Sequence, residues 1–164
     1  MPGNRDFHVL MVCTGNTCRS PMAEGIARAL AMEKAVNDLK FSSAGIMAGD
    51  GAPATDYAVA VAAHWNIDLS GHKSRRLTRE LIEQADLILG MAPEHVDRVI
   101  ELDRSAGSKT FLIKGFPQPF NRSQGMIDDP IGLGLEYYNQ AFLELDEVLR
   151  RVFPSIIEIS RSNV

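Results

Sequence analysis

Short apolar runs alternate along the chain with segments in which apolar residues recur at helical spacing. The apolar runs predict buried strands of a parallel sheet, at 7–12, 40–44, 86–91 and 109–113. The other segments predict helices, at 20–34, 56–65, 78–84 and 93–102. A longer amphipathic helix follows, with an apolar face made by Tyr138, Phe142, Leu145, Leu149 and Val152. This alternation favours an α/β fold, with a parallel sheet flanked by helices on both faces.

The composition narrows the class of protein. A length of 164 residues with 45% apolar and 23% charged residues fits one domain over 1–164. The formal charge of −4 argues against a general nucleic-acid or anionic-membrane binder. No apolar run approaches the roughly 20 residues of a spanning helix, and the run at 7–13 is too short for a signal-peptide core. We therefore expect a cytoplasmic protein with neither nucleic acid nor membrane as a partner.

The chain has two cysteines, Cys13 and Cys18, which lie close together near its start. One such pair makes neither a tetrahedral zinc site nor a secreted disulfide framework. We therefore expect no structural metal and look for a chemical role for these thiols.

The segment between the first strand and the first helix carries the clearest chemistry. Six residues separate Cys13, which ends the strand, from Ser20, which is expected to cap the helix. They turn at the carboxyl edge of the sheet, where open α/β sheets bind ligands. Gly15 and Asn16 accept positive φ, so successive N–H groups can form an anion nest. Arg19 adds a guanidinium fork that suits a tetrahedral oxyanion. The predicted phosphate-binding loop comprises Thr14, Gly15, Asn16, Thr17, Cys18 and Ser20, between Cys13 and the helix.

Cys13 lies at the base of this loop. Amide dipoles, the Arg19 guanidinium and the Ser20 hydroxyl all stabilise a thiolate, so we expect the pKa of Cys13 to fall below that of a free cysteine. The same donors would hold a phosphate in line with the sulfur. Together these residues outweigh a simple buried-cysteine interpretation. For Cys18, two alternatives stay open: plain packing, or a disulfide that captures oxidised Cys13.

A long connection at 114–135 supplies the second half of the chemistry. It exceeds the usual length of a structural loop, which indicates a functional one. Asp129 lies in it, and Pro130 biases Asp129 toward an extended conformation. A carboxylic acid there can protonate the leaving group and then act as the base for a hydrolytic water.

These motifs resemble those of the low-molecular-weight protein tyrosine phosphatase family, and the match covers nearly the whole chain. The matching segments lie at 13–21, 43–45, 68–74, 86–89 and 129–130. The resemblance implies a four-stranded parallel sheet and no metal or organic cofactor. It also implies Cys13 as nucleophile, Arg19 as phosphate and transition-state clamp, and Asp129 as general acid and then base. The residues whose hydrogen bonds would hold the loop in shape are Asn16, Ser20, Ser43 and His72.

The departures from the family pattern concern the substrate. Ile131 and Gly132 follow the Asp-Pro pair where tyrosine-directed members carry aromatic residues. Tyrosine-directed members often have a bulky aliphatic residue at the position of Thr17. With threonine there, the loop resembles that of the bacterial protein arginine phosphatase branch. A hydroxyl there can accept a guanidinium N–H, although Thr17 can equally bond within its own turn. We expect Met47 and Ile131 to form apolar walls. The expected activity is protein tyrosine phosphatase, with protein arginine phosphatase as the alternative.

Two other function classes fit the chain less well. Thioredoxin-coupled arsenate reductases resemble this fold, but their relay uses cysteines late in the chain, and none follows Cys18. A non-catalytic phosphopeptide-binding module would not need both a nucleophile and an acid. The expected partner is therefore a phosphorylated protein substrate, and a monomer is the expected state.

Overall fold

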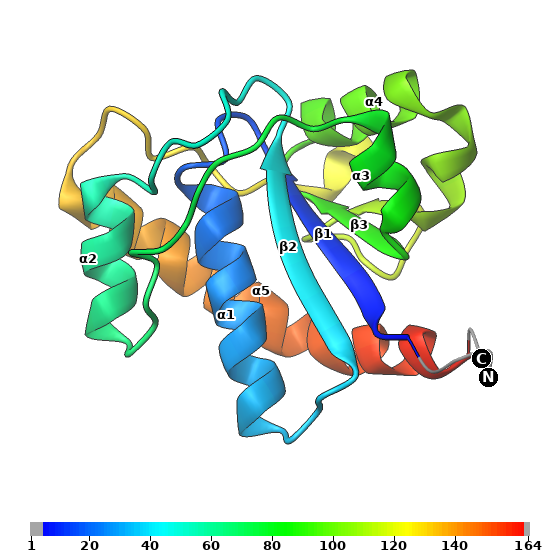
Figure 1. Ribbon diagram of the computed structural model, residues 1–164, viewed down its shortest axis with the longest axis horizontal. Coiled ribbons are helices and arrows are strands. Elements are labelled where there is room, and N and C mark those ends of the chain that lie inside the picture. The colour runs from blue at the N-terminus through cyan, green and yellow to red at the C-terminus, as the bar shows by residue number, and fades with distance from the viewer. Residues whose placement is uncertain (1–4, 163–164) are drawn as a thin grey trace.

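Four parallel strands form the centre of the protein in the order β2-β1-β3-β4 (Figure 1). The computed structural model describes residues 5–162. The strands are β1 (Phe7–Cys13), β2 (Leu39–Gly45), β3 (Leu87–Gly90) and β4 (Thr110–Leu112). The predicted α/β class and the four-stranded parallel sheet are confirmed, and each strand lies within one or two residues of its predicted range.

Helices cover both faces of this sheet (Figure 1). The helices are α1 (Arg19–Glu33), α2 (Asp56–His64), α3 (Arg79–Gln84), α4 (Pro93–Leu102) and α5 (Leu135–Ser162). Two 3₁₀ turns, η1 (Arg104–Lys109) and η2 (Arg122–Gln124), lie between α4 and α5. Successive residues of β1 are buried on opposite faces of the sheet. Val9 and Met11 join the apolar core under α1, α2 and α5. Leu10 and Val12 join a second core with residues of α3 and α4. This two-sided burial explains the continuous apolar run.

The last helix is longer than its apolar pattern predicts. It begins at Leu135 and continues through Pro154 to Ser162. Phe153 and Ile156 are fully buried beside this proline, and the Phe153 ring lies 6.3 Å from that of Phe41 in β2. Packing against the sheet therefore stabilises α5 on both sides of Pro154, although this proline removes one backbone hydrogen bond.

The carboxyl ends of three strands meet at one edge of the sheet. Cys13 pairs with Gly45 of β2, and Val12 pairs with Gly90 of β3. A Cβ atom on Gly45 would lie 2.5 Å from the Thr14 carbonyl oxygen, so only glycine lets β2 approach the loop after β1 this closely. The loop is therefore held directly against the end of the neighbouring strand.

No helix of the described residues 5–162 is both long and apolar enough to cross a membrane.

Candidate active site

Asn16 organises the loop between β1 and α1. Its φ is +58°, as the sequence allows, and its side chain is fully buried. Its Nδ2 donates to the hydroxyl oxygens of Ser20, at 2.8 Å, and Ser43, at 2.9 Å. Its Oδ1 accepts the backbone N–H of Arg75 at 2.9 Å. One amide therefore ties the loop to α1, to β2 and to the segment before α3.

A second layer of hydrogen bonds supports this amide. His72 Nε2 donates to the Asn16 carbonyl at 2.7 Å. Ser43 Oγ donates to a carboxylate oxygen of Glu24 at 2.7 Å, and Arg75 Nε donates to the Ser43 carbonyl at 2.9 Å. The structure thus brings together the four residues expected to hold the loop. The sequence pointed to neither Glu24 nor Arg75, because each acts only through a partner distant in the chain.

Cys13 and Ser20 form the closest pair at the base of the loop. Cys13 Sγ lies 2.9 Å from Ser20 Oγ. Because Ser20 Oγ already accepts from Asn16 Nδ2, its own proton is available to the sulfur. The sequence led us to expect that Ser20 caps α1, and this expectation is wrong. The N-cap residue is Cys18, which makes no side-chain capping bond, and the Ser20 hydroxyl is directed into the loop.

The pKa of Cys13 also differs from the expectation. Burial raises the pKa of this thiol, and it outweighs the Ser20 hydroxyl, nearby backbone N–H groups and the Arg19 charge, which all lower it. The expected lowering of the Cys13 pKa is therefore wrong. The pattern of donors could be inferred from the sequence, but the desolvation of a side chain only 2% exposed could not.

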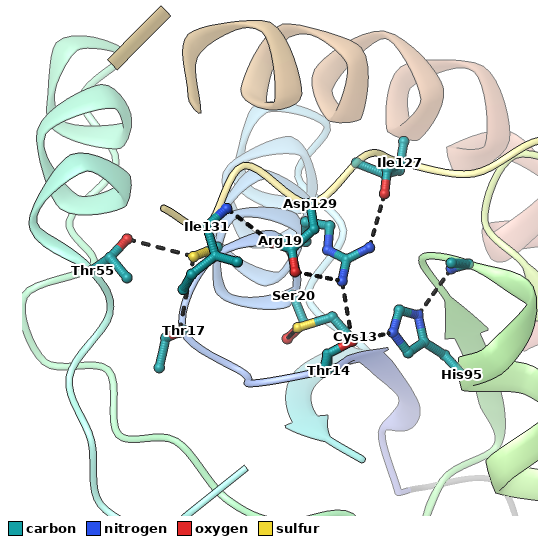
Figure 2. A network of polar contacts seen from close by, with 12 residues as sticks. Cys13, Thr14, Thr17, Arg19, Ser20, Thr55, His95, Ile127, Asp129 and Ile131 are labelled. Carbon is teal, nitrogen blue, oxygen red and sulfur yellow. Dashed lines mark hydrogen bonds and ion pairs between the residues drawn. The ribbon is translucent and has the colours of Figure 1, made fainter. Parts of the chain in front are cut away.

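Arg19 connects the loop to the acidic segment. Its side chain is 4% exposed, and Nη1 donates to the Ile127 carbonyl at 2.9 Å. Its Nη2 lies 3.3 Å from Thr14 Oγ1 and 3.4 Å from a carboxylate oxygen of Asp129 (Figure 2). The backbone N–H of Ile127 donates to the carbonyl of Met91, the residue that follows β3, so the acidic segment is anchored on two sides.

The expected acid lies at the mouth of a small cavity. Asp129 is 37% exposed in its side chain, and its other carboxylate oxygen accepts the N–H of Ile131 at 3.1 Å. The cavity measures about 150 Å³ and is lined by Thr14, Gly15, Thr17, Cys18, Arg19, Asp129 and Ile131. Met47 is 73% exposed and is not one of these lining residues, although its N–H donates to the Thr14 carbonyl. Its role as a substrate wall stays a prediction.

Cys18 is packed against α5. Its Sγ lies 3.3 Å from the Tyr138 hydroxyl and 3.6 Å from Thr55 Oγ1. Burial and the contact with Cys18 raise the pKa of Tyr138 to about 12. Both cysteines are free and buried, and Thr17 Oγ1 lies 3.9 Å from Cys18 Sγ. Of the two interpretations of Cys18, packing is the one that these contacts favour.

His95 at the start of α4 also reaches the loop, and sequence reasoning missed it. It is fully buried, and its Nε2 lies 2.9 Å from Thr14 Oγ1 (Figure 2). The available signal was a histidine two residues after Pro93, in the first turn of a helix whose N-cap residue, Ala92, has no polar side chain.

Comparisons with known proteins agree with this geometry. The family model described as low molecular weight phosphotyrosine protein phosphatase matches residues 8–162. A protein-arginine-phosphatase of Bacillus subtilis is 37% identical over 144 residues, covering 88% of this chain and 93% of that protein. The low molecular weight protein-tyrosine-phosphatase Etp of Escherichia coli is 36% identical over 131 residues, covering 76% of this chain and 85% of that protein.

A solved structure extends the likeness to the fold. The YwlE arginine phosphatase, as a mutant with a phosphorylated active-site serine, superposes with a TM-score of 0.84 at 35% identity. The superposition covers 92% of this chain and 95% of that one. Since both the sequence match and the superposition extend over nearly the whole chain, the protein belongs to the low molecular weight phosphotyrosine protein phosphatase family.

Proposed function

We propose that this protein phosphatase hydrolyses phosphorylated protein side chains by passing the phosphoryl group through Cys13. The observation that carries the proposal is the convergence of the Arg19 guanidinium and the Asp129 carboxylate on one small cavity lined by the loop that Cys13 begins. A cysteine, an oxyanion-binding guanidinium and a carboxyl group supply the nucleophile, the phosphate clamp and the acid–base group of a two-step phosphoryl transfer.

In the first step, the Cys13 thiolate attacks phosphorus, a sulfur–phosphorus bond forms and the bond to the leaving oxygen breaks. Protonated Asp129 gives its proton to that oxygen. Arg19 and the N–H groups of the loop hold the non-bridging oxygens, where negative charge is concentrated. Burial makes the thiolate costly, and the Ser20 hydroxyl offsets part of this cost because it donates to the sulfur.

In the second step, the Asp129 carboxylate takes a proton from water, whose oxygen attacks phosphorus. The sulfur–phosphorus bond breaks, and Cys13 leaves as a thiolate that again accepts a hydrogen bond from the Ser20 hydroxyl. A serine that carries phosphate in the active site of the YwlE mutant supports a covalent route on this fold.

Quenched-flow mass spectrometry tests the covalent step. Wild-type protein mixed with a phosphotyrosyl peptide should carry one phosphoryl group on the peptide that contains Cys13. Cys18→Ala provides the matched control and should keep this adduct, while Cys13→Ala should lose both the adduct and turnover. Sustained product release by Cys13→Ala would contradict the proposal.

For the substrate, we propose phosphotyrosine as the principal side chain. Ile131 lines the cavity and is 53% exposed, so it offers an apolar surface to a phenyl ring. The family to which the chain belongs is named for phosphotyrosine, and this supports the choice.

Phosphoarginine is the second candidate, and one observation favours it. The Thr17 side chain lines the same cavity, and its contact with Cys18 Sγ is long, at 3.9 Å. A hydroxyl oxygen has two lone pairs, so Thr17 can accept an N–H from a guanidinium while it keeps this contact, and the Bacillus subtilis relative is a protein-arginine-phosphatase.

A side-by-side rate comparison separates the two substrates. We expect Thr17→Ile to raise the ratio of kcat/KM for phosphotyrosine over phosphoarginine peptides, with Thr17→Ser as the control that keeps the hydroxyl. An unchanged ratio in Thr17→Ile would remove Thr17 as the selector.

A further inference from the structure

The protonation pattern of His95 is determined by its backbone neighbour. The ring is fully buried, and its Nδ1 accepts the N–H of Ala92 at 2.9 Å. Nδ1 must therefore carry a lone pair, and a neutral imidazole then carries its proton on Nε2. Burial and the nearby Arg19 charge lower the pKa of His95 to about 3, so the ring is neutral at physiological pH.

This pattern makes Nε2 a donor to Thr14. Thr14 Oγ1 lies 2.9 Å from His95 Nε2 and 3.3 Å from Arg19 Nη2. A guanidinium has no acceptor, and His95 Nε2 has none in this tautomer. Both neighbours therefore donate, both lone pairs of the threonine oxygen are used, and its own proton must point in a third direction.

That third direction is significant because Thr14 lines the small cavity that Arg19 and Asp129 also border. We propose that His95 is a positioning residue that acts through Thr14. It orients the threonine hydroxyl so that this hydroxyl donates a hydrogen bond to an oxyanion in the cavity. The proposal rests on the proposed function, because it assigns an additional donor to the same phosphate site.

A close contact between β3 and α4 places His95 beside the loop. A Cβ atom on Gly90, the last residue of β3, would lie 3.2 Å from His95 Cβ and 3.1 Å from Val96 Cγ2. The absence of a side chain at Gly90 lets the first turn of α4 approach the end of the sheet. The ring then reaches across to the loop after β1.

Two substitutions separate positioning from a purely structural role. His95→Asn keeps an acceptor near the position of Nδ1 and removes the donor to Thr14. His95→Gln keeps an N–H near the position of Nε2 and removes the acceptor for Ala92. If His95 positions Thr14, His95→Asn should lower kcat about 10-fold with little change in Tm, the scale of one hydrogen bond to a charged group. His95→Gln should recover most of kcat while it lowers Tm.

A double-mutant cycle tests whether His95 acts through Thr14. Thr14→Val removes the hydroxyl and should also lower kcat. The His95→Asn/Thr14→Val double variant should be no slower than Thr14→Val alone, because the route from His95 to the phosphate is already absent. Multiplied losses, or a His95→Asn enzyme as fast as wild type, would overturn the proposal.

Tungstate binding gives a readout that does not depend on turnover. In a Cys13→Ser background, calorimetry should show that His95→Asn weakens tungstate affinity about 10-fold, while the exposed His64→Asn leaves it unchanged. If wild type forms no phosphocysteine and tungstate binding still depends on His95, the proposed function fails and the positioning role stands. If phosphocysteine forms and tungstate affinity is unaffected by His95→Asn, the positioning role fails alone.

Discussion

Arg19 donates from Nη1 to the carbonyl of Ile127 at 2.9 Å, two residues before Asp129. The same side chain reaches Thr14 of the loop after β1 through its other terminal nitrogen. One buried guanidinium therefore sets the distance between the loop that binds phosphate and the segment that carries the acid.

The first prediction concerns this double contact. Arg19→Lys keeps the charge but loses the planar fork, so it cannot hold Ile127 and an oxyanion together. We expect kcat to fall about 100-fold or more and the free energy of unfolding to fall by about 1–3 kcal/mol. Steady-state kinetics and urea unfolding measure the two effects. A stable variant with wild-type kcat would show that the fork is dispensable.

Removal of the Ser20 hydroxyl should raise the pKa of Cys13 further. The hydroxyl is the largest of the effects that oppose burial at this thiol. In Ser20→Ala, the thiolate absorbance near 240 nm should therefore appear at higher pH than in wild type. Ser123→Ala, at an exposed site in η2, is the control. A lower pKa in Ser20→Ala would contradict the assignment of the donor.

Asn16 should contribute both through its side chain and through its backbone. Asn16→Gly tolerates the φ of +58° and removes the amide that Ser20, Ser43 and Arg75 contact. We expect it to lower the free energy of unfolding by about 1–3 kcal/mol. Asn16→Ala should cost about 1 kcal/mol more, since alanine disfavours positive φ. Chemical denaturation of the pair measures this difference, and equal stability would argue against backbone strain.

Gly45→Ala should impair the loop while the sheet stays paired. The added Cβ would meet the Thr14 carbonyl at 2.5 Å and the Asn16 nitrogen at 2.9 Å, so the loop must shift. We expect loss of most phosphatase activity with an unchanged far-ultraviolet circular dichroism spectrum. Gly49→Ala, where a Cβ meets nothing within 4 Å, should behave as wild type. Full activity in Gly45→Ala would show that the loop tolerates this shift.

His95 should make the protein less stable in acid. Its pKa is about 3 in the folded protein, below the ordinary value of 6.5. The folded state therefore disfavours a proton that the unfolded chain binds. The contribution of His95 to the free energy of unfolding is complete above pH 6.5. It is lost as the pH falls toward 3, by at most about 1.4 kcal/mol per pH unit. Urea unfolding of His95→Asn should show a shallower decline over this range, and an identical slope would contradict the shifted pKa.

Much of the fold followed from local patterns. The apolar run of β1 is buried by helices on both faces, which is why a strand and its parallel partners could be inferred without coordinates. The end of α5 could not be inferred, because Pro154 breaks the local pattern and burial of Phe153 and Ile156 compensates from outside the helix. Ser20 was misassigned as a cap for a related reason: its hydroxyl has a better partner in Cys13 than in the backbone of α1.

The sequence by itself identified the loop from Cys13 to Ser20, because the apolar strand before it, the turn residues Gly15 and Asn16 and the start of the helix after it are local features of the chain. Only the tertiary structure decided what surrounds this loop. The supports from Ser43 and His72, the approach of Asp129 and the donor on His95 depend on how strands and helices distant in the chain pack together. The raised pKa of Cys13 has the same origin, since desolvation is the sum of every group that excludes water from the sulfur.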